Sequence, residues 1–127
     1  MLCVYLESVT VSESVKFLEL GFSSIEIGLM NRGPESPVKL HRHRPRESFY
    51  EGRTQEVIVL LKGKLSFGVF TDSGSFIDSR ELSGPSIIIF LQGAHEIEFL
   101  SRCDLIELKT GPYLGKFDKI WMSASEG

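Results

Sequence analysis

The sequence predicts a single all-β domain, an antiparallel β-barrel or sandwich. Apolar and polar residues alternate in several short runs, turn-forming residues separate these runs, and helical periodicity is scarce. Alternation with a period of two is typical of a strand with one buried face, and many short strands at regular spacing are typical of sandwiches and barrels. The 127 residues are enough for one domain, predicted to span residues 1–127, with a core of its own.

The strands can be placed along the chain from the pattern of each run. Residues 24–29, 64–70 and 95–100 alternate clearly, whereas residues 57–61 and 87–91 are continuously apolar, which predicts strands covered on both faces. Residues 13–20 fit either a short helix or a strand. The barrel core is therefore expected at about residues 24–110, with a polar insertion in a rim loop at 44–55. Residues 111–127 are expected to form an extended arm with Trp121 as its packing anchor.

The bulk composition excludes several classes of protein. Hydrophobic residues make up 42% of the chain and the formal net charge is −3, values typical of a soluble globular protein. We expect no nucleic-acid binding and no membrane span, because no broad basic surface and no apolar run of about 20 residues is present. No secretory signal is recognisable. A cytoplasmic location with Cys3 and Cys103 reduced is expected, although the sequence leaves open whether they pair.

The three histidines of the chain form the most informative group. His41 and His43 are two residues apart and so lie on one face of a strand, and His95 alternates with the apolar residues Ile97 and Phe99. Neighbouring imidazoles in a core need partners for their ring nitrogens, and a shared cation would provide one. The alternative is three structural histidines with separate partners.

The spacing of these residues resembles the motifs of the cupin superfamily. His41-x-His43, followed by Glu56 and, after six residues, Gly63, resembles the first motif, and Gly84 with His95 resembles the second. The sequence departs from the second motif at its proline, glycine and asparagine positions, which are Phe90, Gln92 and Phe99. The tail, with residues 111–115 and the pair Asp118-Lys119, resembles that of a group of small, largely uncharacterised cupins, some of which are encoded among polysaccharide-synthesis genes.

The resemblance implies a cupin-type jelly-roll barrel, often a homodimer, that binds one divalent transition metal, either Fe, Mn, Ni or Zn, through His41, His43, Glu56 and His95. Twelve residues separate His43 from Glu56, where the family has three or four. Glu47 has the family spacing from the histidines but no glycine seven positions later, so Glu56 is preferred and Glu47 is kept as the alternative. A cation at Lys39 on the same face would oppose metal binding, which predicts either a bulge there or a position of Lys39 below the site.

The basic rim segment supplies candidates for ligand binding. Arg44, Arg46 and Arg53 are candidates for holding an anionic small molecule, unless they only form a solvated charged rim. Catalytic residues cannot be assigned, and the candidates are His41, His43 and Tyr50, with Tyr113 as a second tyrosine.

Three functions stay open at this point. The first is a metal-dependent enzyme, an isomerase or a dioxygenase, acting on a sugar derivative or a small keto or oxy acid in carbohydrate metabolism. The second is a barrel that binds or senses a small molecule without catalysis. The third is a metal-free nucleotide-sugar isomerase that uses His41 and His43 as acid and base.

Overall fold

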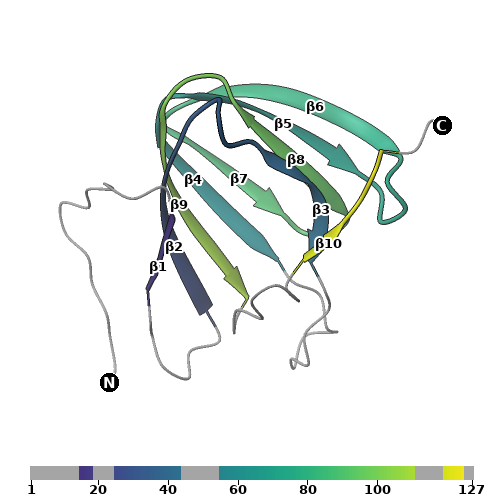
Figure 1. Cartoon of the computed structure of the whole chain (residues 1–127). Coiled ribbons are helices and arrows are strands. Elements are labelled where there is room, and N and C mark those ends of the chain that lie inside the picture. Colours follow the sequence, from purple (N-terminus) through teal and green to yellow (C-terminus); the bar gives the residue numbers. More distant parts are fainter. Residues whose placement is uncertain (1–14, 19–24, 44–54, 111–118, 125–127) are drawn as a thin grey trace.

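Two five-stranded antiparallel sheets face each other and form an open barrel (Figure 1). The computed structural model describes residues 15–18, 25–43, 55–110 and 119–124. The first sheet has the order β1 (Val15–Leu18), β2 (Ile25–Arg32), β9 (Cys103–Thr110), β4 (Glu56–Lys62) and β7 (Ser86–Phe90). The second has the order β10 (Lys119–Trp121), β3 (Val38–His43), β8 (Ala94–Phe99), β5 (Lys64–Phe70) and β6 (Phe76–Ser83).

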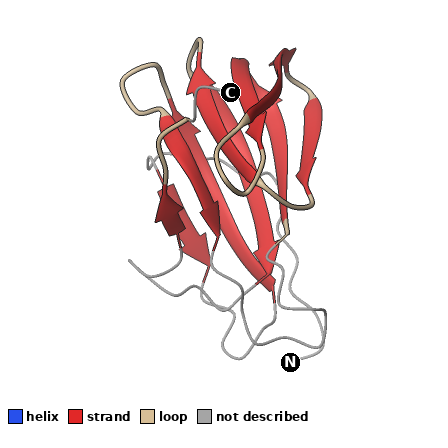
Figure 2. Cartoon of the chain, turned by 90° about the vertical axis from the view of Figure 1, so that its right-hand side faces the viewer, coloured by secondary structure: helices blue, strands red, loops and turns tan. Residues whose placement is uncertain are grey.

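The predicted all-β fold class is confirmed. Within the described residues the chain forms strands joined by loops and contains no helix (Figure 2). None of these residues therefore belongs to a helix long and apolar enough to cross a membrane. Residues 15–18, which fitted either a helix or a strand, pair with β2 as a strand. The domain limits of 1–127 stay a prediction.

Beside a smaller cluster of Leu40, Phe70 and Ala94, one larger apolar core packs between the two sheets. It is formed by inward residues from five strands of both sheets: Ile58, Leu60, Leu65, Ile88, Phe90, Ile97, Phe99, Cys103 and Leu105. Leu60, Leu65 and Cys103 have no exposed surface at all. Cys103 is a free thiol, and burial raises its pKa. Cys3 lies outside the described residues.

The turn from β4 to β5 explains the glycine of the first motif. Gly63 has a φ of 98°, a conformation that side chains disfavour. A Cβ atom at this position would lie only 2.7 Å from the sulfur of Cys103 and would also collide with the Arg102 carbonyl. Gly63 therefore lets the hairpin close against the start of β9.

Two predictions about apolar residues are wrong. The runs 57–61 and 87–91 were expected to be covered on both faces, but Leu61, Ile87, Ile89 and Leu91 are 36% to 64% exposed. The reason is that β7 is the edge strand of its sheet and that these side chains lie on the outer face. Trp121, expected as a packing anchor, is 60% exposed, because β10 is the edge strand of the other sheet.

Candidate metal centre

Strand pairing brings the three histidines together inside the barrel. His41 on β3 and His95 on β8 are direct partners across the strands, and His43 lies two residues further along β3. The ring centroids of His41 lie 4.6 Å from His95 and 4.9 Å from His43. The inward orientation predicted for His41 and His95 is confirmed, since both are almost completely buried.

The bulge predicted near Lys39 is confirmed. The register between β3 and β8 shifts between Val38 and His41, and Lys39 is exposed. A regular strand would place the Lys39 ammonium group on the same face as His41 and His43. The irregularity therefore removes a positive charge from the histidine cluster.

The same irregularity fixes the tautomer of His41. The Nδ1 atom of His41 lies 2.7 Å from the Lys39 carbonyl oxygen, to which it can only donate a hydrogen bond. The Nε2 atom is then the free acceptor, and it lies 3.3 Å from Nε2 of His43. A carbonyl oxygen that holds the second ring nitrogen in this way is typical of histidines that bind metals.

His95 also has a fixed ring and a nitrogen that lacks a good partner. Phe90 stacks on the imidazole, with centroids 3.9 Å apart and an angle of 9° between the planes. The Nε2 atom of His95 lies 3.1 Å from Oε2 of Glu56, but it is buried and has no aligned hydrogen bond. Buried nitrogens without partners are uncommon and need an explanation. A cation between His95 and Glu56 would satisfy this nitrogen.

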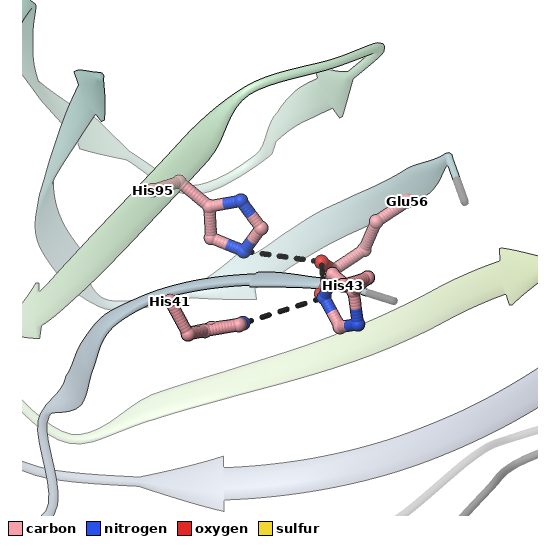
Figure 3. A group of neighbouring side chains, drawn as sticks. All are labelled: His41, His43, Glu56 and His95. Atoms are coloured by element: carbon pink, nitrogen blue, oxygen red, sulfur yellow. Dashed lines mark hydrogen bonds and ion pairs between the residues drawn. The ribbon is translucent and has the colours of Figure 1, made fainter. Parts of the chain in front are cut away.

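Glu56 provides the single carboxylate of this group (Figure 3). It is the first residue of β4, it points inward, and its Oε2 lies 3.1 Å from Nε2 of both His43 and His95. Burial alone would raise the pKa of Glu56, but the hydrogen bond from Glu107 and the close imidazoles of His43 and His95 outweigh burial and hold that pKa well below its usual value. Glu56 is therefore ionised. The preceding residue, Gln55, is exposed.

The four residues predicted as ligands could together hold a metal ion. One ligand atom from each of His41, His43, Glu56 and His95 lies within 4.8 Å of the others. Atoms on opposite sides of a bound ion, each at about 2.1 Å, are about 4.2 Å apart. Small rotations of the side chains would therefore close the site around an ion. Three imidazoles and one carboxylate suit Fe, Mn, Ni or Zn without selecting one of them.

A second group of buried charged residues faces the histidines and was not predicted. Glu26 on β2 and Glu107 and Lys109 on β9 are each at most 6% exposed. The Lys109 ammonium lies 3.4 Å from Oε1 of Glu26, an ion pair without an aligned hydrogen bond, and 4.0 Å from Oε1 of Glu107. Burial and the adjacent Glu56 carboxylate raise the pKa of Glu107 well above its usual value. Glu107 therefore donates the proton in its hydrogen bond with Glu56.

Residues of both groups line a cavity of about 130 Å³. Its polar lining comes from both sides: Arg32, His41, Glu56, Glu107, Lys109 and Lys119. A single water needs only about 10–15 Å³ on a comparable scale, so the cavity can hold several waters or a small organic molecule. The charged lining, which contains both signs, suits a polar ligand.

Several candidate residues lie outside the described part of the chain. They are Arg44, Arg46 and Arg53, the two tyrosines Tyr50 and Tyr113, and the alternative acidic ligand Glu47. Their roles stay predictions. So does the rim insertion at 44–55, of which only Gln55 is described.

The metal-free chain should depend on pH through His41. Burial, followed by the nearby His95, lowers the pKa of His41 from 6.5 to about 3. At pH values between these two pKa values, His41 is protonated in the unfolded chain but neutral in the folded chain. The free energy of unfolding therefore falls as the pH falls through this range. When the pH is lowered from 6.5 to 5, the unfolding free energy of the parent should fall by about 2 kcal/mol more than that of the His41→Asn variant.

This difference can be measured by urea unfolding of both chelator-treated proteins at the two pH values. The raised pKa of Glu107 acts in the opposite direction, but it is common to both proteins and largely cancels in their difference. Asparagine keeps an N–H donor near the position of Nδ1 for the Lys39 carbonyl. If the difference in unfolding free energy between the two proteins stayed constant from pH 6.5 to pH 5, His41 would have to take up its proton in the folded chain as well.

Comparison with known proteins supports the fold. No family model and no curated protein matches the sequence. Among solved structures, oxalate decarboxylase from Bacillus subtilis matches at a TM-score of 0.61 and 13% identity over 80% of this chain. The cupin domain of Cnp3 from Schizosaccharomyces pombe matches at 0.58 and 14% over 83%. A protein from Neisseria meningitidis matches at 0.55 and 11% over 82%.

These matches show the fold. The chain has a cupin-type fold, as its resemblance to the cupin motifs implied. It spans about a quarter of the length of the oxalate decarboxylase chain, 70% of the Cnp3 cupin domain and 90% of the Neisseria meningitidis protein. Inside this fold, the cluster of three histidines and Glu56 could hold a metal ion.

Proposed function

We propose that the chain is a metal-dependent cupin enzyme that acts on a small oxygenated anion, such as a keto or oxy acid or a sugar derivative. The observation that carries this proposal is the convergence of three imidazoles and one carboxylate beside a polar cavity. A divalent ion bound there would act as a Lewis acid on a ligand oxygen, as in an isomerisation. If the bound ion were iron, it would instead activate molecular oxygen. The oxalate decarboxylase similarity is consistent with small-acid chemistry but supports the fold alone.

The residues of the chain would divide the remaining tasks. The Lys39 carbonyl and the Phe90 ring hold the imidazoles of His41 and His95 in position. Glu107 holds a proton next to Glu56 and is placed to exchange it with a ligand in the cavity. Lys109 provides positive charge on the opposite wall. The apolar core closes the barrel behind these residues and limits access of water.

Cobalt substitution tests this proposal. The cobalt-loaded protein should change its visible absorption when small keto acids, oxy acids or sugar derivatives are added, because a ligand oxygen enters the coordination sphere. A chain saturated with cobalt whose spectrum responds to no candidate would contradict the enzyme proposal. It would favour the second function, a barrel that only binds a metal or a ligand.

The metal-free isomerase is weaker on structural grounds. Its mechanism needs His41 and His43 to exchange protons with a substrate, but Nδ1 of His41 is held by the Lys39 carbonyl and its Nε2 faces His43. The homodimer, the cytoplasmic location and a role in carbohydrate metabolism stay predictions.

A further inference from the structure

The cavity beside the candidate metal centre adjoins a larger groove. This groove has a volume of about 570 Å³ and lies along β3 and β10. Arg32, Val38 and Lys119 line both the groove and the inner cavity. These three residues, called the neck below, therefore lie between the outer groove and the inner cavity.

Lys119 is the most unusual residue of the neck. Its side chain is partly buried, and burial, followed by the positive charge of Lys109, lowers its pKa. Within the described residues no ion pair joins the Lys119 ammonium to a carboxylate, whereas Lys109 pairs with Glu26 and Glu107. Glu107 and Glu56 attract this ammonium only from a distance, and a partly buried amine without a direct ion pair is costly. An anionic ligand in the neck would provide the missing partner.

Arg32 adds a second positive charge at the same place. Its guanidinium donates hydrogen bonds to Ser36, one of them at 2.8 Å to the carbonyl oxygen. Neutral groups accept these bonds, and Glu107 and Glu35 attract the guanidinium without a direct ion pair to it. The neck thus has two cationic residues and the apolar side chain of Val38, which suits a carboxylate joined to a carbon skeleton.

Trp121 provides a flat surface next to the neck. It lines the groove and is 60% exposed, although its ring lies only 5.4 Å from that of His41. The Lys119 ammonium lies 5.5 Å from the centre of the same indole ring. An exposed indole beside a buried cation can stack with a ring while the cation binds a charged group on that ring.

We propose that the neck and groove bind a carboxylic acid attached to a ring. The carboxylate lies between Lys119 and Arg32, the ring lies on Trp121, and oxygen substituents extend toward His41 and Glu56. The orientation of the bound acid, with its oxygen substituents toward Glu56, rests on the proposed function, because a divalent ion next to Glu56 would attract ligand oxygens. It assigns anion binding to residues of β2 and β10 instead of the rim arginines.

Aromatic acids and sugar acids both carry a carboxylate on a ring, so the experiment compares these two sources. Trp121 is the only tryptophan of the chain, so its fluorescence reports on the groove directly. The full-length protein should be titrated with benzoate and glucuronate, and with benzyl alcohol and glucose as their neutral counterparts. We expect saturable changes of emission with at least one acid, at concentrations about tenfold lower than with its neutral counterpart.

Variants then test the roles of the two residues. Lys119→Met should weaken binding of that acid by about tenfold or more, since methionine keeps the length of the side chain but not the charge. Lys64→Met is the matched control, because Lys64 is exposed and pairs with Glu81 on β6, away from the groove. Trp121→Leu, followed by calorimetry, should lose the preference for the ring acid over acetate.

Each outcome decides the proposal. Equal binding by the acid and its neutral counterpart, or unchanged affinity in a folded Lys119→Met variant, overturns it. The metal content of every sample should be measured in parallel. Acid binding that depends on Lys119 in a chain unable to bind metal would support the groove site and contradict the proposed function. Metal binding without ring-acid binding would contradict the groove site alone.

Discussion

Replacing His43 and His95 together by alanine should reduce the metal content from about one divalent ion per chain to none. The two imidazoles approach Glu56 from different strands, β3 and β8, and each Nε2 lies 3.1 Å from Oε2 of Glu56. Only His41 and Glu56 would remain, and two ligands rarely retain a transition metal against buffer and chelator. Elemental analysis of protein purified without chelators, before and after loading, measures the effect.

The alanine variant needs a control for folding, because His95 is buried under Phe90. The double substitution by glutamine keeps most of the side-chain volume and should also lose the ion. A circular dichroism spectrum dominated by β structure should persist in both variants. Full metal content in either folded double variant would mean that the ion binds elsewhere and that the histidine assignment is wrong.

Glu56→Gln should weaken metal binding by roughly 100-fold or more, whereas Glu47→Gln should leave it nearly unchanged. Glutamine has the size of glutamate but removes the only anionic ligand of the group. Glu56 is ionised, buried and in contact with two of the imidazoles. Competition with a chelating dye would give the affinities of both variants and of the parent chain.

Glu47→Gln is the matched control for this comparison, because it makes the same chemical change in the predicted insertion. If Glu47→Gln weakened binding and Glu56→Gln did not, the inserted segment would have to fold into the barrel and supply the ligand. The present choice between the two acids would then be reversed.

The sequence predicted the fold and the cluster of candidate ligands because both depend on local spacing. Alternation identified the strands, and the HxH pair, Glu56 and His95 fell on inward positions. The bulge at Lys39 followed from electrostatics, since a lysine beside three inward imidazoles would be unfavourable.

The charged wall opposite the histidines could not be predicted in the same way. In residues 25–29 the apolar side chains alternate with Glu26, which suggests that the isoleucines face the core. In the structure Glu26 is buried and Ile25 is 53% exposed. Alternation divides a strand into two faces but does not show which face is inside. Glu107 and Lys109, two residues apart on one face, were the available signal for a buried ion pair.

The position of Trp121 was missed for a related reason. A lone tryptophan in a segment without periodicity is usually part of the core. Here it lies on a three-residue edge strand, where the pairing of β10 with β3 places it next to His41. Pairing between residues about 80 positions apart is a property of the whole sheet and is not encoded in the local pattern.

The shared boundary of the apolar core and the charged wall bears on how such a protein can adapt. Phe99 and Leu105 belong to the core, yet they line the same cavity as Glu107 and Lys109. Because residues that share a cavity are coupled, substitutions in the core and in the charged wall should combine non-additively. Selection for a new ligand would therefore also change the stability of the fold. Binding preference and thermal tolerance would then evolve as linked traits.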